Sequence, residues 1–113
     1  MNYNIFTHKL SEALQSAHDL ALNLKHNTLD EVHFLRAMLD QKDGFVPQIL
    51  KQLNVNPQDI KDKATLTLQK YPKIEGSYQL NISQTLQTLL LEAEKLMQKM
   101  GDSYLSTQHV FLA

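Results

Sequence analysis

The fold of this chain is constrained most by an internal repeat at a spacing of 76 residues. Two segments carry apolar residues at offsets of 0, 3, 4, 7, 10, 11 and 14, which trace one stripe along an α-helix. The first stripe consists of Leu10, Ala13, Leu14, Ala17, Leu20, Ala21 and Leu24. The second consists of Leu86, Leu89, Leu90, Ala93, Leu96, Met97 and Met100. The same shift carries Leu29 to Leu105, His33 to His109 and Ala37 to Ala113. Because it holds across the intervening loop, we interpret the sequence as a duplicated helical unit.

Capping residues and helix breakers divide the chain into six expected helices. Five of these helices have a recognisable N-cap, namely Thr7, Asp30, Asn56, Ser83 and Ser106. The remaining one is a short helix whose apolar residues are Val46, Ile49, Leu50 and Leu53. The second helix is expected to stop near Asp43-Gly44 and the fourth before Pro72, so residues 72–82 are expected to form a loop. Only three glycines and three prolines are present, which favours an all-α fold.

We expect one domain over residues 1–113, built as a pseudo-twofold duplicated helical bundle. The first repeat spans about residues 5–71, a linker follows over residues 72–82, and an incomplete second repeat spans residues 83–113. Because Ala113 aligns with Ala37, the counterparts of the third and fourth helices would follow Ala113. The chain is therefore interpreted as part of a longer protein, cut within a helix.

Composition and missing motifs exclude several classes of function. A net charge of −1 provides no basic surface for nucleic acid, and the longest aliphatic run, 89–91, is too short to cross a membrane. The absence of cysteine fits a reducing cytoplasm, which is the location we expect. The sequence contains no phosphate-binding G-x-x-x-x-G-K-[ST] loop, no G-x-S-x-G elbow and no H-E-x-x-H helix. We therefore predict neither an enzyme active site nor a cofactor.

Two of the five histidines occupy matching positions at predicted helix starts. His33 lies three residues after Asp30 and His109 lies three residues after Ser106, where a side chain can close a capping box. Each is flanked by apolar residues placed to form a hydrophobic staple, Leu29 with Phe34 and Leu105 with Val110. We therefore predict a structural role for both histidines. No metal site is expected, because no histidine pairs with another at i, i+4 and no cysteine is available.

Several segments together resemble the N-terminal domain of the Clp family of AAA+ unfoldases. They are Phe6-Thr7 at the start of the first helix, residues 24–35, residues 101–105 and residues 106–113. Residues 71–76, Tyr-Pro-Lys-Ile-Glu-Gly, are similar to the P-x-[VI]-x-G connection between repeats in the disaggregase branch of that family. The resemblance covers residues 5–113, which is essentially the whole chain.

The resemblance implies two repeats of four helices, attached flexibly to a hexameric AAA+ ring. It also implies an apolar groove that engages unfolded or aggregated polypeptide. Thr7 and Asp102 match residues at the polar edge of the family's groove, whereas Gln108 stands where the disaggregase branch has a glutamate, so hydrogen bonding is kept and the charge is lost. Leu90 or Leu91 would supply the floor, although Leu90 also fits a core position and Thr7 is equally explained as an N-cap.

The function expected from these observations is substrate recognition by the N-terminal domain of a protein disaggregase. Its predicted substrate-binding residues are Thr7, Leu90, Leu91, Asp102 and Gln108. The alternative is an adaptor-docking N domain of a Clp protease ATPase subunit or of a secretion-system unfoldase. A small helical enzyme or a nucleic-acid-binding protein is the third class, and the missing motifs and the charge of −1 argue against it.

Overall fold

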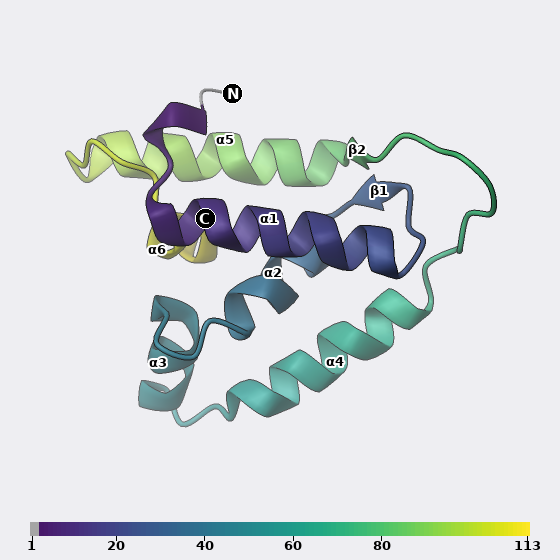
Figure 1. Ribbon diagram of the computed structural model, residues 1–113. Coiled ribbons are helices and arrows are strands. Elements are labelled where there is room, and N and C mark those ends of the chain that lie inside the picture. The colour runs from purple at the N-terminus through teal and green to yellow at the C-terminus, as the bar shows by residue number, and fades with distance from the viewer. Residues whose placement is uncertain (1–2) are drawn as a thin grey trace.

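The computed structural model describes residues 3–113 and shows an all-α chain with two very short strands (Figure 1). In chain order the elements are η1 (Tyr3–Ile5), α1 (His8–Asn23), β1 (Thr28–Leu29), α2 (Glu31–Leu39), α3 (Phe45–Gln52), α4 (Pro57–Gln69), β2 (Asn81–Ile82), α5 (Gln84–Lys99) and α6 (Thr107–Leu112). The six predicted α-helices are confirmed. Among these residues no helix is both long and apolar enough to cross a membrane.

The two long helices, α1 and α5, are equivalent members of the repeat. Each has 16 residues, and they run in opposite directions in Figure 1. Both predicted N-caps are formed: Thr7 Oγ1 accepts the N–H of Leu10 at 3.2 Å, and Ser83 Oγ accepts the N–H of Leu86 at 3.0 Å. Each helix packs most extensively on the short helix that follows it in its own repeat, α1 on α2 and α5 on α6.

The strands were not predicted, and they join the two repeats. β1 pairs in parallel with β2, with Leu29 opposite Ile82, and a separate parallel bridge joins Phe6 to Leu105. The shift of 76 residues converts one of these pairs into the other, because it carries Phe6 to Ile82 and Leu29 to Leu105. The predicted loop over 72–82 is therefore wrong at its last two residues. A two-residue strand is too short to show the alternation by which strands are recognised in a sequence.

Matching turns follow α1 and α5. Lys25 and Gly101, which are 76 residues apart, both adopt the left-handed conformation that ends many helices, with φ of 60° and 76°. Beyond α2 and α6 the two halves differ, because α3 and α4 have no counterpart in residues 84–113. The second helix ends at Leu39, before the predicted stop near Asp43-Gly44, and its C-cap Asp40 pairs with Arg36 and Lys61.

Candidate functional site

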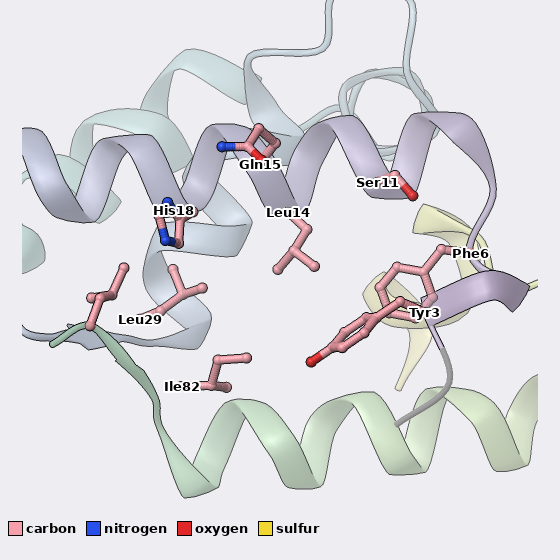
Figure 2. Close-up of a pocket in the computed structure, with 9 residues that line it drawn as sticks. Tyr3, Phe6, Ser11, Leu14, Gln15, His18, Leu29 and Ile82 are labelled. Atoms are coloured by element: carbon pink, nitrogen blue, oxygen red, sulfur yellow. The ribbon is translucent and has the colours of Figure 1, made fainter.

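Two adjoining cavities lie between α1 and α5, and together they form what we call the α1–α5 groove. Their volumes are about 340 Å³ beside α1 and about 200 Å³ beside α5, and both are lined by Tyr3 and Ile82. Figure 2 shows Leu14, Leu29 and Ile82 pointing into the space between the two helices. The other lining residues are Phe6, Ser11, Gln15, His18 and Leu80 in the first cavity and Gln87, Leu90 and Leu91 in the second.

The two cavities are related by the internal repeat. Four residues of the smaller cavity lie 76 positions after four residues of the larger one. The pairs are Phe6 with Ile82, Ser11 with Gln87, Leu14 with Leu90, and Gln15 with Leu91. The pseudo-twofold axis of the chain therefore passes between the two cavities and crosses the groove, and each repeat contributes one wall.

The groove is lined mainly by apolar and neutral polar side chains, with His18 as its one imidazole. None of the described residues that line it is Lys, Arg, Asp or Glu. Tyr3, about half exposed, packs edge-on against Phe6 with 5.3 Å between ring centroids. Ser11, Gln15 and Gln87 contribute hydroxyl and amide groups, which can both donate and accept hydrogen bonds. Such a surface fits apolar side chains that are attached to a polar but uncharged backbone.

The predicted site residues are only partly brought together here. Leu90 and Leu91 both line the smaller cavity, but Leu90 is a core residue with 2% of its surface exposed, whereas Leu91 is 53% exposed. Thr7, Asp102 and Gln108 line neither cavity. Thr7 caps α1 and donates its backbone N–H to Leu105 O at 2.8 Å, and Gln108 is exposed in the first turn of α6.

Asp102 takes part in the capping of α6. His109 Nδ1 accepts the backbone N–H of Ser106 at 3.0 Å, which confirms the predicted capping box. The ring proton of neutral His109 is then on Nε2, which donates to Asp102 Oδ2 at 2.8 Å. The His109 ring is buried, whereas the Asp102 side chain is about half exposed. Asp102 therefore has a structural explanation that the sequence analysis did not foresee.

In the first repeat, the capping histidine of α2 is hydrogen-bonded to a second histidine in place of an aspartate. His33 Nδ1 accepts the N–H of Asp30 at 2.9 Å, which confirms the other capping box, so its Nε2–H donates to His26 Nδ1 at 2.8 Å. His26 precedes Asp102 by 76 residues and occupies the equivalent position. Both rings of this His26–His33 pair are buried. Burial lowers the pKa of His33, and the neighbouring His26 lowers it further. Burial, followed by the charge of Lys73, also lowers the pKa of His26.

Asp30 connects this histidine pair to the second repeat. Its carboxylate accepts hydrogen bonds from Tyr71 Oη at 2.6 Å and from Ser83 Oγ at 2.7 Å. Burial alone would raise the pKa of Asp30, but the hydrogen bonds from Tyr71, Ser83 and the N–H of Glu31 outweigh it and hold that pKa below its usual range. In the opposite direction, burial and the bond to Asp30 raise the pKa of Tyr71. None of the buried side-chain polar atoms in the described part of the chain lacks a partner, and these hydrogen bonds connect α2, the end of α4 and the start of α5.

No group of three or more His, Cys, Asp or Glu side chains that could hold a metal ion is found within residues 3–113. Tyr3, Leu29 of β1 and Ile82 of β2 line the groove but were not predicted to do so. Applying the shift of 76 to the segments before the long helices would have paired Phe6 with Ile82, but nothing in the sequence singles out Tyr3.

Comparison with known proteins gives one family match and several similar sequences. Residues 5–113 match the family described as the Clp repeat (R) N-terminal domain. The chain is 37% identical to the chaperone protein ClpB of Bacillus cereus over 117 aligned residues, covering 100% of this chain and 14% of that protein. It is also 37% identical to the ClpB of Chlamydia caviae, covering 92% of this chain and 12% of that protein. The chain thus spans about one seventh of the length of the curated relatives that it matches.

Solved structures share the fold at lower sequence identity. The N-terminal domain of Hsp104 from Candida albicans superimposes with a TM-score of 0.83 at 23% identity, over 95% of this chain and 71% of that one. A ClpV N-domain in complex with a VipB peptide gives a TM-score of 0.83 at 24% identity, over 96% of this chain and 66% of that one. At these identities the comparisons establish the fold alone.

Proposed function

Because this chain belongs to the Clp repeat N-terminal domain family, we propose that its α1–α5 groove binds unfolded or aggregated polypeptide for a protein disaggregase. The observation that carries the proposal is the uncharged, apolar lining of the groove, with hydroxyl and amide groups at its walls. Exposed apolar side chains on a polar backbone are what unfolded proteins share, whatever their sequence. A charged groove would be unsuitable, because desolvating an unpaired charge against an apolar ligand is costly.

Binding at this groove is expected to be weak. The larger cavity, of about 340 Å³, accommodates only a few side chains, so a single segment buries little surface. Weak binding suits a hexameric AAA+ ring that displays several such domains, because linked sites raise the overall affinity without new contacts. In this proposal ATP hydrolysis resides in the AAA+ ring of the parent protein, the work takes place in the cytoplasm, and neither nucleic acid nor a membrane takes part.

Thr7, Asp102 and Gln108 are proposed to contact the client where it leaves the groove. Thr7 directly follows the groove residue Phe6 and is tied to Leu105 by its backbone. Asp102 and Gln108 are exposed, three residues before and three residues after Leu105. Each can hydrogen-bond a polypeptide backbone. The contribution of these three residues should be smaller than that of Leu91, which lines the groove and is 53% exposed.

The experiment is a titration of fluorescently labelled unfolded casein with the 113-residue chain and matched variants. Leu91→Ser removes an exposed groove side chain, and Leu66→Ser removes a similarly exposed leucine, 59% exposed, on α4. We expect Leu91→Ser to weaken binding about three- to tenfold, equivalent to the loss of one partly buried aliphatic side chain, and Leu66→Ser to leave it unchanged.

Two further variants test the polar edge. Thr7→Ala and Asp102→Ala are expected to weaken casein binding by less than Leu91→Ser, and circular dichroism checks that each variant is folded. Unchanged binding in folded variants would remove these residues from the site. If the unsubstituted chain fails to bind casein even at millimolar concentration, the proposed function is wrong.

The alternative function is docking of a specific adaptor or of a secretion-system component. The VipB-peptide complex shows that a ClpV N-domain with this fold binds a peptide. The curated relatives at 37% identity are ClpB chaperones, however, which supports the disaggregase. Saturable binding of a single peptide sequence, with no binding of unfolded casein, would favour the alternative.

A further inference from the structure

We propose that the α1–α5 groove binds an extended segment with two apolar side chains in both chain directions, with similar affinity. The inference rests on the proposed function, because it concerns how a polypeptide lies in that groove. It follows from the position of the groove on the pseudo-twofold axis. The axis is perpendicular to both helices, because it relates two helices that run in opposite directions. A half turn about it therefore reverses a segment that lies along the groove and exchanges the two cavities.

The apolar residues of the groove permit this exchange. Leu14 in the cavity beside α1 corresponds to Leu90 in the cavity beside α5, and Phe6 corresponds to Ile82. Tyr3 and Ile82 border both cavities, so an apolar side chain meets them in either one. Two aliphatic side chains of a segment therefore have comparable surroundings, whichever of them occupies the cavity beside α1.

The polar residues of the groove do not select a direction either. Reversing an extended segment places carbonyl groups where N–H groups had been. A groove that offered only donors or only acceptors would then lose hydrogen bonds. The Gln15 amide already donates to Asp19 Oδ1 at 3.0 Å and the Gln87 amide to Ile82 O at 3.1 Å, which leaves each amide a second N–H and its carbonyl oxygen. Together with the Ser11 hydroxyl they still offer both donors and acceptors, so both arrangements can be satisfied.

Charged groups give little preference for one direction. The described lining contains no Lys, Arg, Asp or Glu, and its one imidazole, that of His18, lies 3.8 Å from the carboxylate of Asp19. The helices α1 and α5 have equal lengths and run in opposite directions, so their macrodipoles oppose each other along the groove. A peptide dipole therefore gains little from either orientation.

The symmetry is incomplete, which limits the proposal to similar rather than identical affinity. Gln15 corresponds to Leu91, and the two cavities measure about 340 and about 200 Å³. The larger apolar side chain of a segment should therefore prefer the cavity beside α1. For a segment with two identical side chains, we expect the dissociation constants for the two directions to differ by less than about tenfold.

The first test compares an end-capped peptide, containing two leucines among serines and glutamines, with the peptide of reversed sequence. Dissociation constants come from fluorescence anisotropy with the 113-residue chain, and a series of leucine spacings identifies the spacing that binds best. We expect the peptide and its reverse to bind within about tenfold of each other. Both should weaken in Leu91→Ser and neither in Leu66→Ser.

A second measurement reads the orientation directly. A nitroxide at the peptide N-terminus should broaden amide NMR signals at both ends of the groove, at Thr7 and Leu105 and also at Leu29 and Ser83. A nitroxide at the C-terminus should give the same pattern. If the N-terminal label broadens signals at one end of the groove only and the C-terminal label at the other end only, the inference is wrong. Affinities of the two peptides that differ by more than tenfold would also overturn it, and either result leaves the proposed function standing. If neither peptide binds, or if Leu91→Ser affects neither, the groove function itself fails and the inference falls with it.

Discussion

Acid should destabilise this chain through the buried His26–His33 pair. Both ring nitrogens of His33 are engaged, Nδ1 as acceptor from Asp30 and Nε2–H as donor to His26 Nδ1. A second proton on His33 would break the capping box, and a proton on His26 Nδ1 would oppose the Nε2–H of His33. The geometry thus agrees with the lowered pKa of both residues, for which burial is the main cause.

The sign and size of the effect follow from linkage. The unfolded chain binds protons at these histidines near the ordinary pKa of about 6.5, whereas the folded chain binds them only at lower pH. The stability that the pair confers is therefore complete above about pH 6.5 and is lost as the pH falls toward the folded-state pKa values. Each proton bound only by the unfolded chain lowers the free energy of unfolding by about 1.4 kcal/mol per pH unit.

Two such histidines set an upper limit of about 2.7 kcal/mol per pH unit. Because the unfolded histidines are only half protonated at pH 6.5, the loss between pH 6.5 and 5.5 is at most about 2 kcal/mol. At about 4 °C per kcal/mol for a domain of this size, the melting temperature should therefore fall by up to about 8 °C. His26→Asn should roughly halve this fall. Asparagine Oδ1 is attached to Cγ, as Nδ1 of histidine is, so the variant keeps an acceptor for His33 while it removes one titratable group.

The assay is thermal unfolding followed by circular dichroism at about pH 7.5, 6.5 and 5.5. Over this range the pKa of Asp30 and that of Asp40, both held below the usual value, keep these carboxylates ionised. His18→Asn, which removes an exposed histidine outside the pair, is the matched control and should retain the wild-type fall in melting temperature. A melting temperature that does not change with pH in the unsubstituted chain, or equal falls for it and His26→Asn, would refute the reasoning.

Three further outcomes are expected. Lys25 and Gly101 both adopt the left-handed conformation, which only glycine adopts without strain. Lys25→Gly should therefore stabilise the chain by up to about 1 kcal/mol, and Gly101→Ala should destabilise it by about as much. Denaturant unfolding measures both changes. Tyr71→Phe should cost about 1.5–3 kcal/mol in the same assay, because it removes a hydrogen bond to the ionised Asp30. A chain extended by about half a repeat beyond Ala113 should melt at a higher temperature and self-associate less. The reason is that added helices would cover the apolar surface between α2, α5 and α6. Equal melting temperatures, with both chains monomeric, would contradict this.

The helices could be predicted because their signals are local. Periodic apolar residues and N-caps such as Thr7 and Ser83 act within one turn of the chain, and all of these caps are formed. Both capping boxes were predictable for the same reason, because three residues separate His33 from Asp30 and His109 from Ser106. The extent of each repeat stays a prediction, since the family match spans residues 5–113 without dividing them.

The features that could not be predicted depend on contacts between distant residues. His26 and His33 are seven residues apart, and their rings meet only because of the path of the segment between them, which contains β1 and the start of α2. The hydrogen bond from Ser83 to Asp30 spans 53 positions in the sequence, and no local pattern predicts it. The groove is of the same kind, because its walls belong to helices that are 76 residues apart.

The repeat also explains why a groove remains between α1 and α5. Each long helix buries its apolar stripe mainly within its own repeat, so the two helices do not need to pack closely on each other. The Phe6–Leu105 bridge ties the start of α1 to the segment after α5, and the Leu29–Ile82 pair ties the segment after α1 to the start of α5. Both ends of the space are thus fixed by backbone hydrogen bonds, while its middle is lined by side chains. A duplicated unit joined at two equivalent points therefore leaves an apolar groove on its axis, where a bound segment contacts both copies.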